Sequence, residues 1–225
     1  MDGLILIDKP VGITSHDVVN RARRAYNTRR IGHAGTLDPF ATGLLILGIN
    51  KGTKSLTALV GLDKTYIATA HLGAITITDD TEGDRIETPL HTYIQPTEAD
   101  VLQALDSFLG VSEQITPLYS AKKIGGKKMY ELARLGLGET VERPKKNITI
   151  YSIGLVTYHW PELVFQVTCS SGTYIRALAR DLGERLKCGA YLTGLRRTCI
   201  GAYRIEDSTT LDALPVPCYS PATDH

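Results

Sequence analysis

The segment at residues 32–45 reads Gly32-His33-Ala34-Gly35-Thr36-Leu37-Asp38-Pro39-Phe40-Ala41-Thr42-Gly43-Leu44-Leu45. Its apolar end continues to residue 47 and predicts a buried strand, preceded by a glycine-rich loop over residues 31–43. Because Pro39 disfavours the helical conformation at Asp38, that carboxylate lies on a restricted backbone at the start of the strand. Such a carboxylate suits nucleophilic or acid–base chemistry, although an Asp-Pro pair also commonly begins a turn. Gly32, Gly35 and Gly43 permit close approach of a ligand to the backbone.

Regular elements are predicted on both sides of this segment. Residues 4–7 form a short apolar strand that ends in a turn at residues 8–12. Thr14 or Ser15 then caps a helix whose apolar positions are Val18, Val19 and Ala22. Residues 65–72 alternate between apolar and polar side chains and therefore predict a strand. The apolar face of that strand consists of Tyr66, Ala68, Ala70 and Leu72.

The rest of the chain alternates irregularly between helical and strand patterns. An acidic loop contains Asp79, Asp80, Glu82, Asp84 and Glu87. Thr97 caps and Gly110 ends a helix whose apolar face is Val101, Leu102, Leu105, Phe108 and Leu109. Residues 117–147 are rich in lysine, which predicts an exposed segment that projects from the fold (an excursion). We expect strands at about 148–158, 163–169 and within 191–205, a helix at 173–186, and a frayed, proline-bearing tail. This order predicts an α+β fold, a mixed, largely antiparallel sheet flanked by helices.

Composition narrows the class of protein. The chain has 225 residues, 43% hydrophobic and 22% charged, which is enough for a core and too apolar for a disordered protein. Lys+Arg 25 against Asp+Glu 24 excludes a globally basic nucleic-acid coat and allows only a local basic face. The sequence has no membrane-spanning run and no signal peptide, so we expect a cytoplasmic protein without membrane contact. Its four cysteines are expected to be free thiols.

Motifs for cofactors and metals are missing from the sequence. Residues 48–55 have the wrong spacing for a phosphate-binding P-loop, and no G-x-G-x-x-G opens a helix after a strand. The six histidines never pair at metal-ligand spacing. We therefore expect chemistry without a metal ion or an organic cofactor.

A set of ordered motifs gives the chain a family resemblance. Residues 32–45 closely resemble the catalytic motif of the TruB family of tRNA pseudouridine synthases. Further matches across residues 3–205 are Asp8-Lys9-Pro10-x-Gly-x-Thr-Ser, Asp63-Lys64-x-Tyr66, Tyr119-Ser120-Ala121-Lys122 with Gly126-Lys127-Lys128-x-Tyr130-Glu131-x-Ala133-Arg134, Ser171-Gly172-Thr173-Tyr174-Ile175-Arg176 and Leu195-Arg196-Arg197. The resemblance implies the pseudouridine synthase fold and a stand-alone enzyme that isomerises uridine 55 in the T-arm stem-loop of tRNA.

The resemblance also implies roles for individual residues. Asp38 matches the catalytic aspartate, which either attacks the sugar or removes a sugar proton. Tyr66 matches the tyrosine that stacks on the flipped uracil and is a candidate to take its C5 proton. Arg176 matches the arginine that pairs with the aspartate, and His33 matches the residue that replaces the flipped nucleotide in its stack. Other expected substrate contacts are Gly32, Gly35, Thr36, Lys64, Lys122, Lys127, Lys128, Tyr174 and Leu195.

Residues 119–136 resemble a thumb loop that closes over RNA. Its lysines, together with basic residues at 143–146 and the arginines of 21–30, suit contacts with phosphates and would form the local basic face. We expect a catalytic domain at residues 1–210, a short tail at 211–225 and no PUA domain. A monomer without an obligatory protein partner is expected.

Three other functions fit parts of the same sequence pattern. Guide-RNA-dependent H/ACA pseudouridine synthases share the motif around Asp38 but resemble this chain less at residues 119–136. A non-catalytic tRNA-binding or tRNA-folding module would use the same surface. A glycosidase would need two carboxylates flanking the scissile bond, and only Asp38 lies in a suitable motif.

Overall fold

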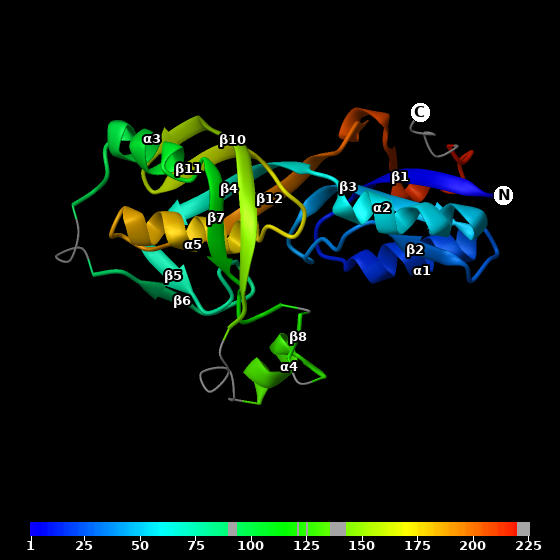
Figure 1. Ribbon diagram of the computed structural model, residues 1–225, viewed down its shortest axis with the longest axis horizontal. Coiled ribbons are helices and arrows are strands. Elements are labelled where there is room, and N and C mark those ends of the chain that lie inside the picture. The colour runs from blue at the N-terminus through cyan, green and yellow to red at the C-terminus, as the bar shows by residue number, and fades with distance from the viewer. Residues whose placement is uncertain (90–93, 121, 125, 136–142, 220–225) are drawn as a thin grey trace. The chain divides into compact units, whose positions relative to one another are not determined.

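The computed structural model describes residues 1–89, 94–120, 122–124, 126–135 and 143–219. The chain divides into two compact units, one formed by residues 1–67 and 194–225 and the other by residues 68–193 (Figure 1). Two strands, β4 (Lys64–Leu72) and β12 (Ala190–Ile200), contribute to both units. The predicted α+β fold with a mixed, largely antiparallel sheet flanked by helices is confirmed.

The sheet of the first unit has the strand order β14-β1-β3-β12. Strand β1 (Gly3–Lys9) pairs antiparallel with β3 (Thr42–Ile49), and β3 pairs parallel with β12. The short strand β14 (Thr209–Thr210) runs parallel to β1, and β13 (Tyr203–Arg204) pairs with β12. The predicted strands at residues 4–7 and 44–47 are therefore confirmed and lie side by side.

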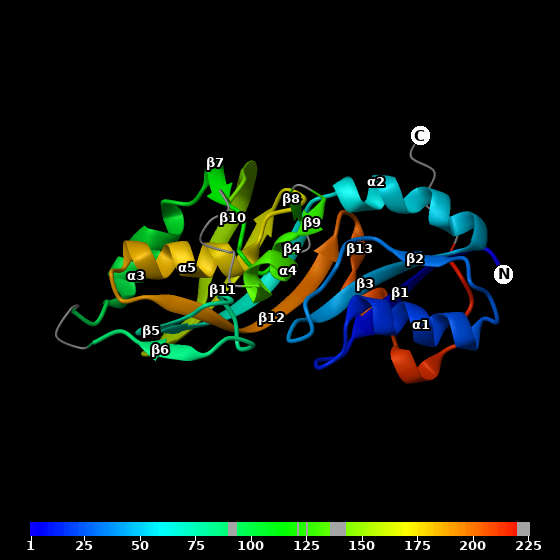
Figure 2. The same ribbon diagram turned by 90° about the horizontal axis from the view of Figure 1, so that it is seen from below.

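Helices cover both faces of this sheet (Figure 2). Helix α1 (Ser15–Ala25) begins at a capping box between Thr14 and Asp17, as its sequence predicts, and buries Val18, Val19 and Ala22 against one face. The opposite face carries the 3₁₀ helix η1 (Asn50–Ser55) and α2 (Leu56–Gly61). The alternation of β1 and β3 thus separates two apolar layers, one on each face of the sheet.

Two predictions for the first unit are wrong. Residues 31–43 are not a loop throughout, because β2 (Ile31–His33) pairs antiparallel with β3. Residues 211–219 are not frayed: Leu211, in the 3₁₀ helix η5 (Leu211–Ala213), is buried, and Tyr219 exchanges two backbone hydrogen bonds with Leu4, of 2.7 and 2.8 Å. These contacts with β1 outweigh the chain-breaking effect of the prolines.

The second unit has the strand order β12-β4-β11-β10-β7. Strands β11 (Glu162–Cys169), β10 (Lys145–His159) and β7 (Gly110–Ile115) are antiparallel neighbours. Helix α5 (Ile175–Arg185) and helix α3 (Glu98–Asp106, capped by Thr97) contact each other and this sheet. The predicted alternation of β4 is confirmed, since Tyr66, Ala68, Ala70 and Leu72 are all buried.

Details of the second unit correct the sequence reading. The predicted acidic loop contains a hairpin of β5 (Ala74–Thr76) and β6 (Arg85–Glu87), and its carboxylates at positions 79 and 80 are buried. In α3, Val101 and Leu105 form the buried stripe, and Phe108 is buried just beyond the end of the helix. Leu102 is exposed because it lies about 100° around the helix axis from Val101, and Leu109 is exposed in the segment that follows the helix.

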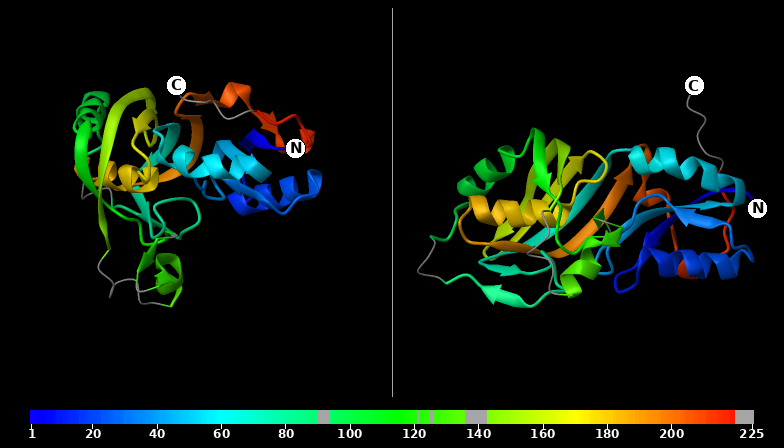
Figure 3. Two further views of the ribbon diagram at one scale, coloured as in Figure 1. Left: turned by 45° about the vertical axis from the view of Figure 1, so that its right-hand side comes forward. Right: turned by 60° about the horizontal axis from the view of Figure 1, so that its bottom comes forward.

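The thumb-like segment connects β7 to β10 and projects from their ends in Figure 1 and in the left panel of Figure 3. It contains β8 (Lys123–Ile124) paired with β9 (Lys127–Lys128), followed by α4 (Met129–Arg134). Met129 and Leu132 are buried, so the predicted excursion is not exposed throughout. No helix among the described residues is long and apolar enough to cross a membrane.

Candidate functional site

Asp38 lies at the first position of a tight turn. The Ala41 N–H donates to the Asp38 carbonyl over 3.1 Å, and Pro39 occupies the second position, where its fixed φ favours the turn. The Gly12 N–H donates to the Pro39 carbonyl at 2.9 Å and ties the turn to the segment that follows β1. The Asp38 residue is half-buried. The turn predicted for the Asp-Pro pair is therefore present, and it is this turn that restricts the backbone of Asp38.

Ser15 holds the residue before Asp38 by its backbone. The buried Ser15 hydroxyl accepts a hydrogen bond from the Leu37 N–H at 2.8 Å and donates one to the Leu37 carbonyl at 3.0 Å. Since Ser15 is the first residue of α1, this contact fixes the turn against the start of that helix.

Lys9 connects two residues that follow Asp38 to the end of β1. Its side chain is completely buried, and its ammonium group donates to three backbone carbonyls: Pro10 at 2.9 Å, Pro39 at 3.4 Å and Ala41 at 2.7 Å. Three donors meet three acceptors, so the desolvated ammonium is fully used. Burial lowers the pKa of Lys9 from 10.5 to about 8, which the nearby Asp38 carboxylate opposes and the charge of Arg197 assists.

Arg197 supports the same loop from β12. The guanidinium is buried and donates from Nε to the Leu44 carbonyl at 2.8 Å and from Nη2 to the Gly35 carbonyl at 3.1 Å. Its neighbour Arg196 forms a bidentate pair with Asp8, with distances of 2.7 and 3.1 Å. Arg197 therefore connects β3, which follows the turn, to β12. Arg196 connects β1, which precedes the turn, to the same strand.

The backbone geometry and close contacts of the loop explain why glycine occupies three of its positions. A Cβ atom at Gly43, where φ is +103°, would lie 2.3 Å from the Arg197 carbonyl oxygen. A Cβ at Gly32 would lie 2.9 Å from the Leu56 side chain, and Gly35 has a φ of +95°. Close approach of a ligand at these positions stays a prediction.

The other candidate residues of the first unit differ in exposure. Thr36 is exposed, whereas Tyr66 and Leu195 are buried. Lys64 is also buried, and its ammonium donates to the carbonyls of Val60 and Leu62, so contact with substrate stays a prediction for this residue. Burial, and then the charge of Arg197, lower the pKa of His33 below 6.5, which favours a neutral ring at pH 7.

Arg176 is the centre of a buried polar cluster in the second unit. Its guanidinium donates to the Thr78 carbonyl at 2.7 Å and to the Tyr119 carbonyl at 3.0 Å, and it lies 3.3 Å from the Asp80 carboxylate. Asp80 also accepts hydrogen bonds from the Thr78 hydroxyl at 2.6 Å and the Glu82 N–H at 2.9 Å. Because Tyr119 begins the thumb-like segment, Arg176 connects the start of that segment to the hairpin region.

A second ion pair adjoins this cluster. Asp79 has a left-handed backbone, with φ at 62°, and its carboxylate lies 3.1 Å from Arg180, which also pairs with Asp181 at 2.7 Å. Burial raises the pKa of Asp79 to about 6, against the opposing effect of Arg180. The acidic loop predicted from the sequence therefore serves to neutralise two arginines of α5.

Tyr174 and the lysines of the thumb-like segment complete the predicted set. The Gln114 side chain accepts from the Tyr174 N–H at 2.8 Å and donates to its carbonyl at 3.0 Å, which fixes Tyr174 at the start of α5. Lys122 is exposed, and Lys127 and Lys128 form the backbone of β9.

The predicted site residues fall into the two compact units. The loop of Asp38 belongs to the first unit together with Tyr66 and Leu195, and Arg176 and Tyr174 belong to the second. The pairing of Asp38 with Arg176 stays a prediction. The predicted site residues do not include Lys9, Ser15, Arg197, Asp80 or Gln114. Lys9, Ser15 and Arg197 lie within the motifs quoted above, and this is the signal that could have identified them.

The pKa of Lys9 predicts opposite effects of alkaline pH on activity and on stability. Above pH 8 the group loses its proton and one of three N–H donors, so we expect kcat/KM to fall with an apparent pKa of about 8. The folded pKa lies below the unfolded one, and the unfolded chain therefore binds more protons between pH 8 and 10.5. The contribution of Lys9 to the free energy of unfolding should thus rise in that range.

Comparison with Lys9→Met isolates this effect from other titrating groups. The difference in the free energy of unfolding between the wild type and this variant, measured in urea at several pH values, should move in favour of the wild type above pH 8. A difference that is flat or falls with pH would contradict the titration of Lys9.

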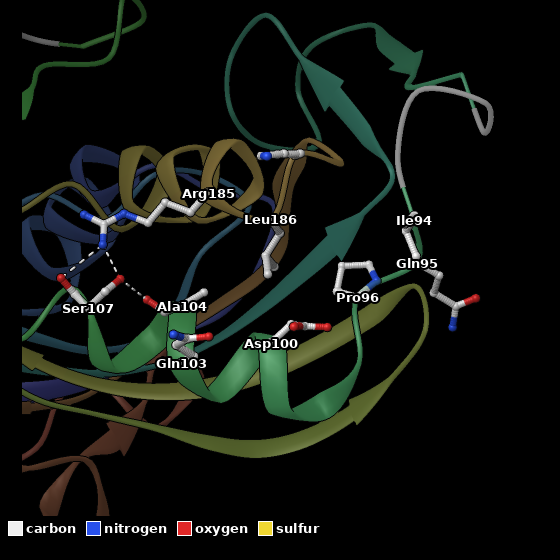
Figure 4. Close-up of a pocket in the computed structure, with 10 residues that line it drawn as sticks. Ile94, Gln95, Pro96, Asp100, Gln103, Ala104, Ser107, Arg185 and Leu186 are labelled. Carbon is white, nitrogen blue, oxygen red and sulfur yellow. Dashed lines mark hydrogen bonds between the residues drawn. The ribbon is translucent and has the colours of Figure 1, made fainter.

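A cavity of about 720 Å³ lies elsewhere in the second unit, between α3 and the end of α5 (Figure 4). Arg185 reaches across it to the Ser107 carbonyl at 3.0 Å and to the Ser107 hydroxyl, and its guanidinium stacks 3.8 Å above the Phe108 ring. None of the predicted site residues lines this cavity. Within the described part of the chain, no three acidic, histidine or cysteine side chains are grouped to hold a metal ion.

Comparison with known proteins assigns the chain to a family. The model of the TruB family pseudouridylate synthase (N terminal domain) matches residues 23–175, and that of the tRNA pseudouridylate synthase B C-terminal domain matches residues 176–220. A tRNA pseudouridine synthase B of Burkholderia mallei is 49% identical over 214 residues, covering 95% of this chain and 69% of that protein. The protein of the same name from Opitutus terrae is 46% identical over 221 residues, with 96% and 90% covered.

Solved structures support the fold. A crystal structure of a Cbf5-Nop10-Gar1 complex contains a chain that is 30% identical, with a TM-score of 0.73. An H/ACA RNP bound to a substrate RNA contains one that is 27% identical, with a TM-score of 0.70. Each covers 94% of this chain, which in turn spans about half of the solved chains, 53% and 52%.

Proposed function

Because the chain belongs to the TruB family of pseudouridylate synthases, we propose that it isomerises the uridine at position 55, in the T-arm of tRNA, to pseudouridine. The reaction breaks the bond between N1 of uracil and C1′ of the ribose, turns the base, and joins C5 to C1′. The proton on C5 leaves and N1 gains a proton, so the atoms balance without a redox partner. We propose that the chain acts as a cytoplasmic monomer.

Asp38 supplies the catalytic carboxylate in this proposal. It attacks C1′ or removes a proton from the sugar, and both routes need an ionised group in a fixed place. The single observation that carries the proposal is the support of its turn by three buried side chains. Ser15, Lys9 and Arg197 hold the backbone on both sides of Asp38 through hydrogen bonds to five residues of the segment 35–44. Such preorganisation is typical of a catalytic group.

Other residues serve the flipped base. Tyr66 stacks on the uracil and accepts the C5 proton, and Leu195 and Tyr174 form apolar walls around it. Arg176 pairs with the Asp38 carboxylate and orients it, because a planar guanidinium can donate two parallel hydrogen bonds to a carboxylate. The neutral ring of His33 inserts into the stack that the flipped nucleotide leaves, which offsets part of the cost of base flipping.

The comparisons favour a stand-alone enzyme over a guide-dependent one. The identity to proteins named tRNA pseudouridine synthase B is 46–49%, against 30% for the chain in the Cbf5-Nop10-Gar1 complex and 27% for the chain in the H/ACA RNP. The catalytic domain corresponds to residues 1–210 in this proposal, with residues 211–225 as a short tail.

Release of tritium tests the proposed reaction directly. A T-arm hairpin labelled with tritium at C5 of its uridines should lose label to water when the chain is added, because C5 exchanges its hydrogen for the bond to C1′. A hairpin with cytidine at position 55 is the matched control and should release none. Retention of the label in the first hairpin at saturating protein would overturn the proposal.

The thumb-like segment is expected to contribute phosphate contacts. Replacing Lys127 and Lys128 by glutamine should reduce the slope of log affinity against log salt by up to about two units, because each phosphate contact releases counterions. The slope is obtained from hairpin binding at several potassium chloride concentrations. An unchanged slope would show that this segment does not contact phosphates.

A further inference from the structure

Three arginines surround an open pocket at the end of α1. The pocket has a volume of about 760 Å³ and is lined by Asn20, Arg23, Arg24, Asn27, Thr28 and Arg29. We refer to these six residues as the arginine pocket. All of them belong to the first unit, and Arg23 contacts β2, the strand that ends at His33.

The arginines of the arginine pocket form no ion pair with a carboxylate of the described residues. Arg21, one turn earlier, pairs with Asp212 at 3.8 Å. Among the described residues, no carboxylate lies within 4.0 Å of a side-chain nitrogen of Arg23, Arg24 or Arg29. Three like charges on one small surface repel one another, and a bound anion relieves that repulsion.

The guanidinium of Arg23 is held in a fixed position. Its Nη1 donates to the Asn20 side chain at 3.1 Å and its Nη2 to the Ile31 carbonyl at 3.2 Å. The Nε atom is buried and has no acceptor in the part of the chain that the structure describes. A desolvated N–H without an acceptor is costly, and a negative charge against the same guanidinium offsets that cost.

The helix dipole explains only part of this cluster. Arginines in the last turn of a helix are stabilised by the carbonyl end of the dipole, which accounts for Arg23 and Arg24. Arg29 lies beyond the end of α1. The intervening turn is fixed, since the Thr28 N–H donates to the Arg23 carbonyl at 3.2 Å and the Thr28 hydroxyl to Asn50 at 2.9 Å. The pocket is therefore formed by an ordered turn as well as by the helix.

We propose that the arginine pocket binds a backbone phosphate in the stem of the RNA substrate, away from the uridine that is isomerised. This inference rests on the proposed function. Guanidinium groups match the geometry of phosphate, and asparagine and threonine side chains commonly donate to phosphate and sugar oxygens. None of the six lining residues is aromatic, so the pocket offers no platform for stacking a base. The pocket thus holds the backbone and does not read sequence.

The salt dependence of RNA binding tests this site. The double variant Arg24→Gln/Arg29→Gln removes two exposed charges and leaves Arg23 in place. The matched control Lys187→Gln/Arg204→Gln also removes two exposed positive charges. Lys187 lies in the second unit and Arg204 in β13, so neither belongs to the arginine pocket. For the pocket variant, the slope of log affinity against log salt should decrease by about one to two units, since each phosphate contact contributes about 0.9. The control should keep the wild-type slope.

A shortened RNA stem locates the contact. The pocket variant should bind a T-arm hairpin with its complete stem at least about tenfold more weakly than the wild type, which is about 1.4 kcal/mol. On a hairpin cut to the base pairs next to the loop, both proteins should bind with similar affinity. Equal slopes for the pocket variant and the wild type, an equal slope change in the control, or the same loss with both stems would overturn the inference.

Single-turnover tritium release separates this inference from the proposed function. At saturating hairpin the pocket variant should react at the wild-type rate, because its residues are not placed at the uridine. If the wild type is active but the binding of the pocket variant is unchanged, only the phosphate site is wrong. If the wild type releases no tritium while the binding differences persist, the proposed reaction is wrong and the phosphate site stands.

Discussion

The variant Asp38→Asn is expected to lose pseudouridine formation by at least about a thousandfold, the scale of a missing acid, base or nucleophile. Asparagine has the size of aspartate, and the turn at this position rests on backbone contacts of Ser15, Lys9 and Arg197. The fold should therefore persist while the charge is lost. Single-turnover tritium release at saturating hairpin measures the rate, and hairpin affinity should change little.

The matched control for this variant is Asp212→Asn. Asp212 belongs to the same unit, its side chain is 96% exposed, and its loss removes the same charge. This control should react at the wild-type rate. If Asp38→Asn retains activity within tenfold of the wild type while the control does the same, the carboxylate has no catalytic role and another group must carry the reaction.

The variant Arg176→Lys is expected to lower kcat by about a hundredfold to a thousandfold with little change in KM. Lysine keeps the charge but lacks the planar fork that reaches Thr78, Tyr119 and Asp80 together. The proposed pairing with the Asp38 carboxylate needs the same fixed guanidinium. Steady-state rates over a range of hairpin concentrations separate kcat from KM.

A buried ion pair also contributes to stability, so this variant needs a control on the same helix. Arg180→Lys alters the neighbouring pair with Asp79, whose side chain is similarly shielded, and should destabilise the fold by a comparable amount. Its activity should remain within about threefold of the wild type. If both variants lose activity in proportion to their loss of stability in urea, Arg176 acts only through the fold.

Local sequence signals predicted the elements whose stabilising contacts are local. Thr14 and Thr97 form capping boxes with Asp17 and Asp100, and the helices begin where these residues indicate. The clean alternation of residues 65–72 likewise matches β4. Strand β2 was missed because its three residues are extended only through pairing with β3, at Ile31↔Ile49 and His33↔Leu47. Such a tertiary contact leaves no periodicity in the sequence.

The chemistry of the site was predicted where a motif carried it and missed where distant residues carried it. The glycine-rich surroundings and the proline of Asp38 fit either a restricted carboxylate or an ordinary turn, and only the family motif predicts the catalytic carboxylate. The sequence places Lys9 in a turn, because nothing near it in the sequence shows that its ammonium reaches carbonyls 30 and 32 positions away. Asp80 is predicted in an acidic loop without an assigned partner, since Arg176 lies 96 positions later. Long-range pairing of charges is not readable from one sequence.

The central claim is that this chain makes pseudouridine at one tRNA position with Asp38 as its carboxylate. Incubation with an unmodified tRNA transcript that carries the T-arm, followed by position-resolved mapping of pseudouridine, tests it most directly. We expect complete conversion at position 55, no modification of the other uridines, and no conversion by Asp38→Asn. An unmodified position 55 after incubation with the wild type, or equal conversion by Asp38→Asn, would contradict the account.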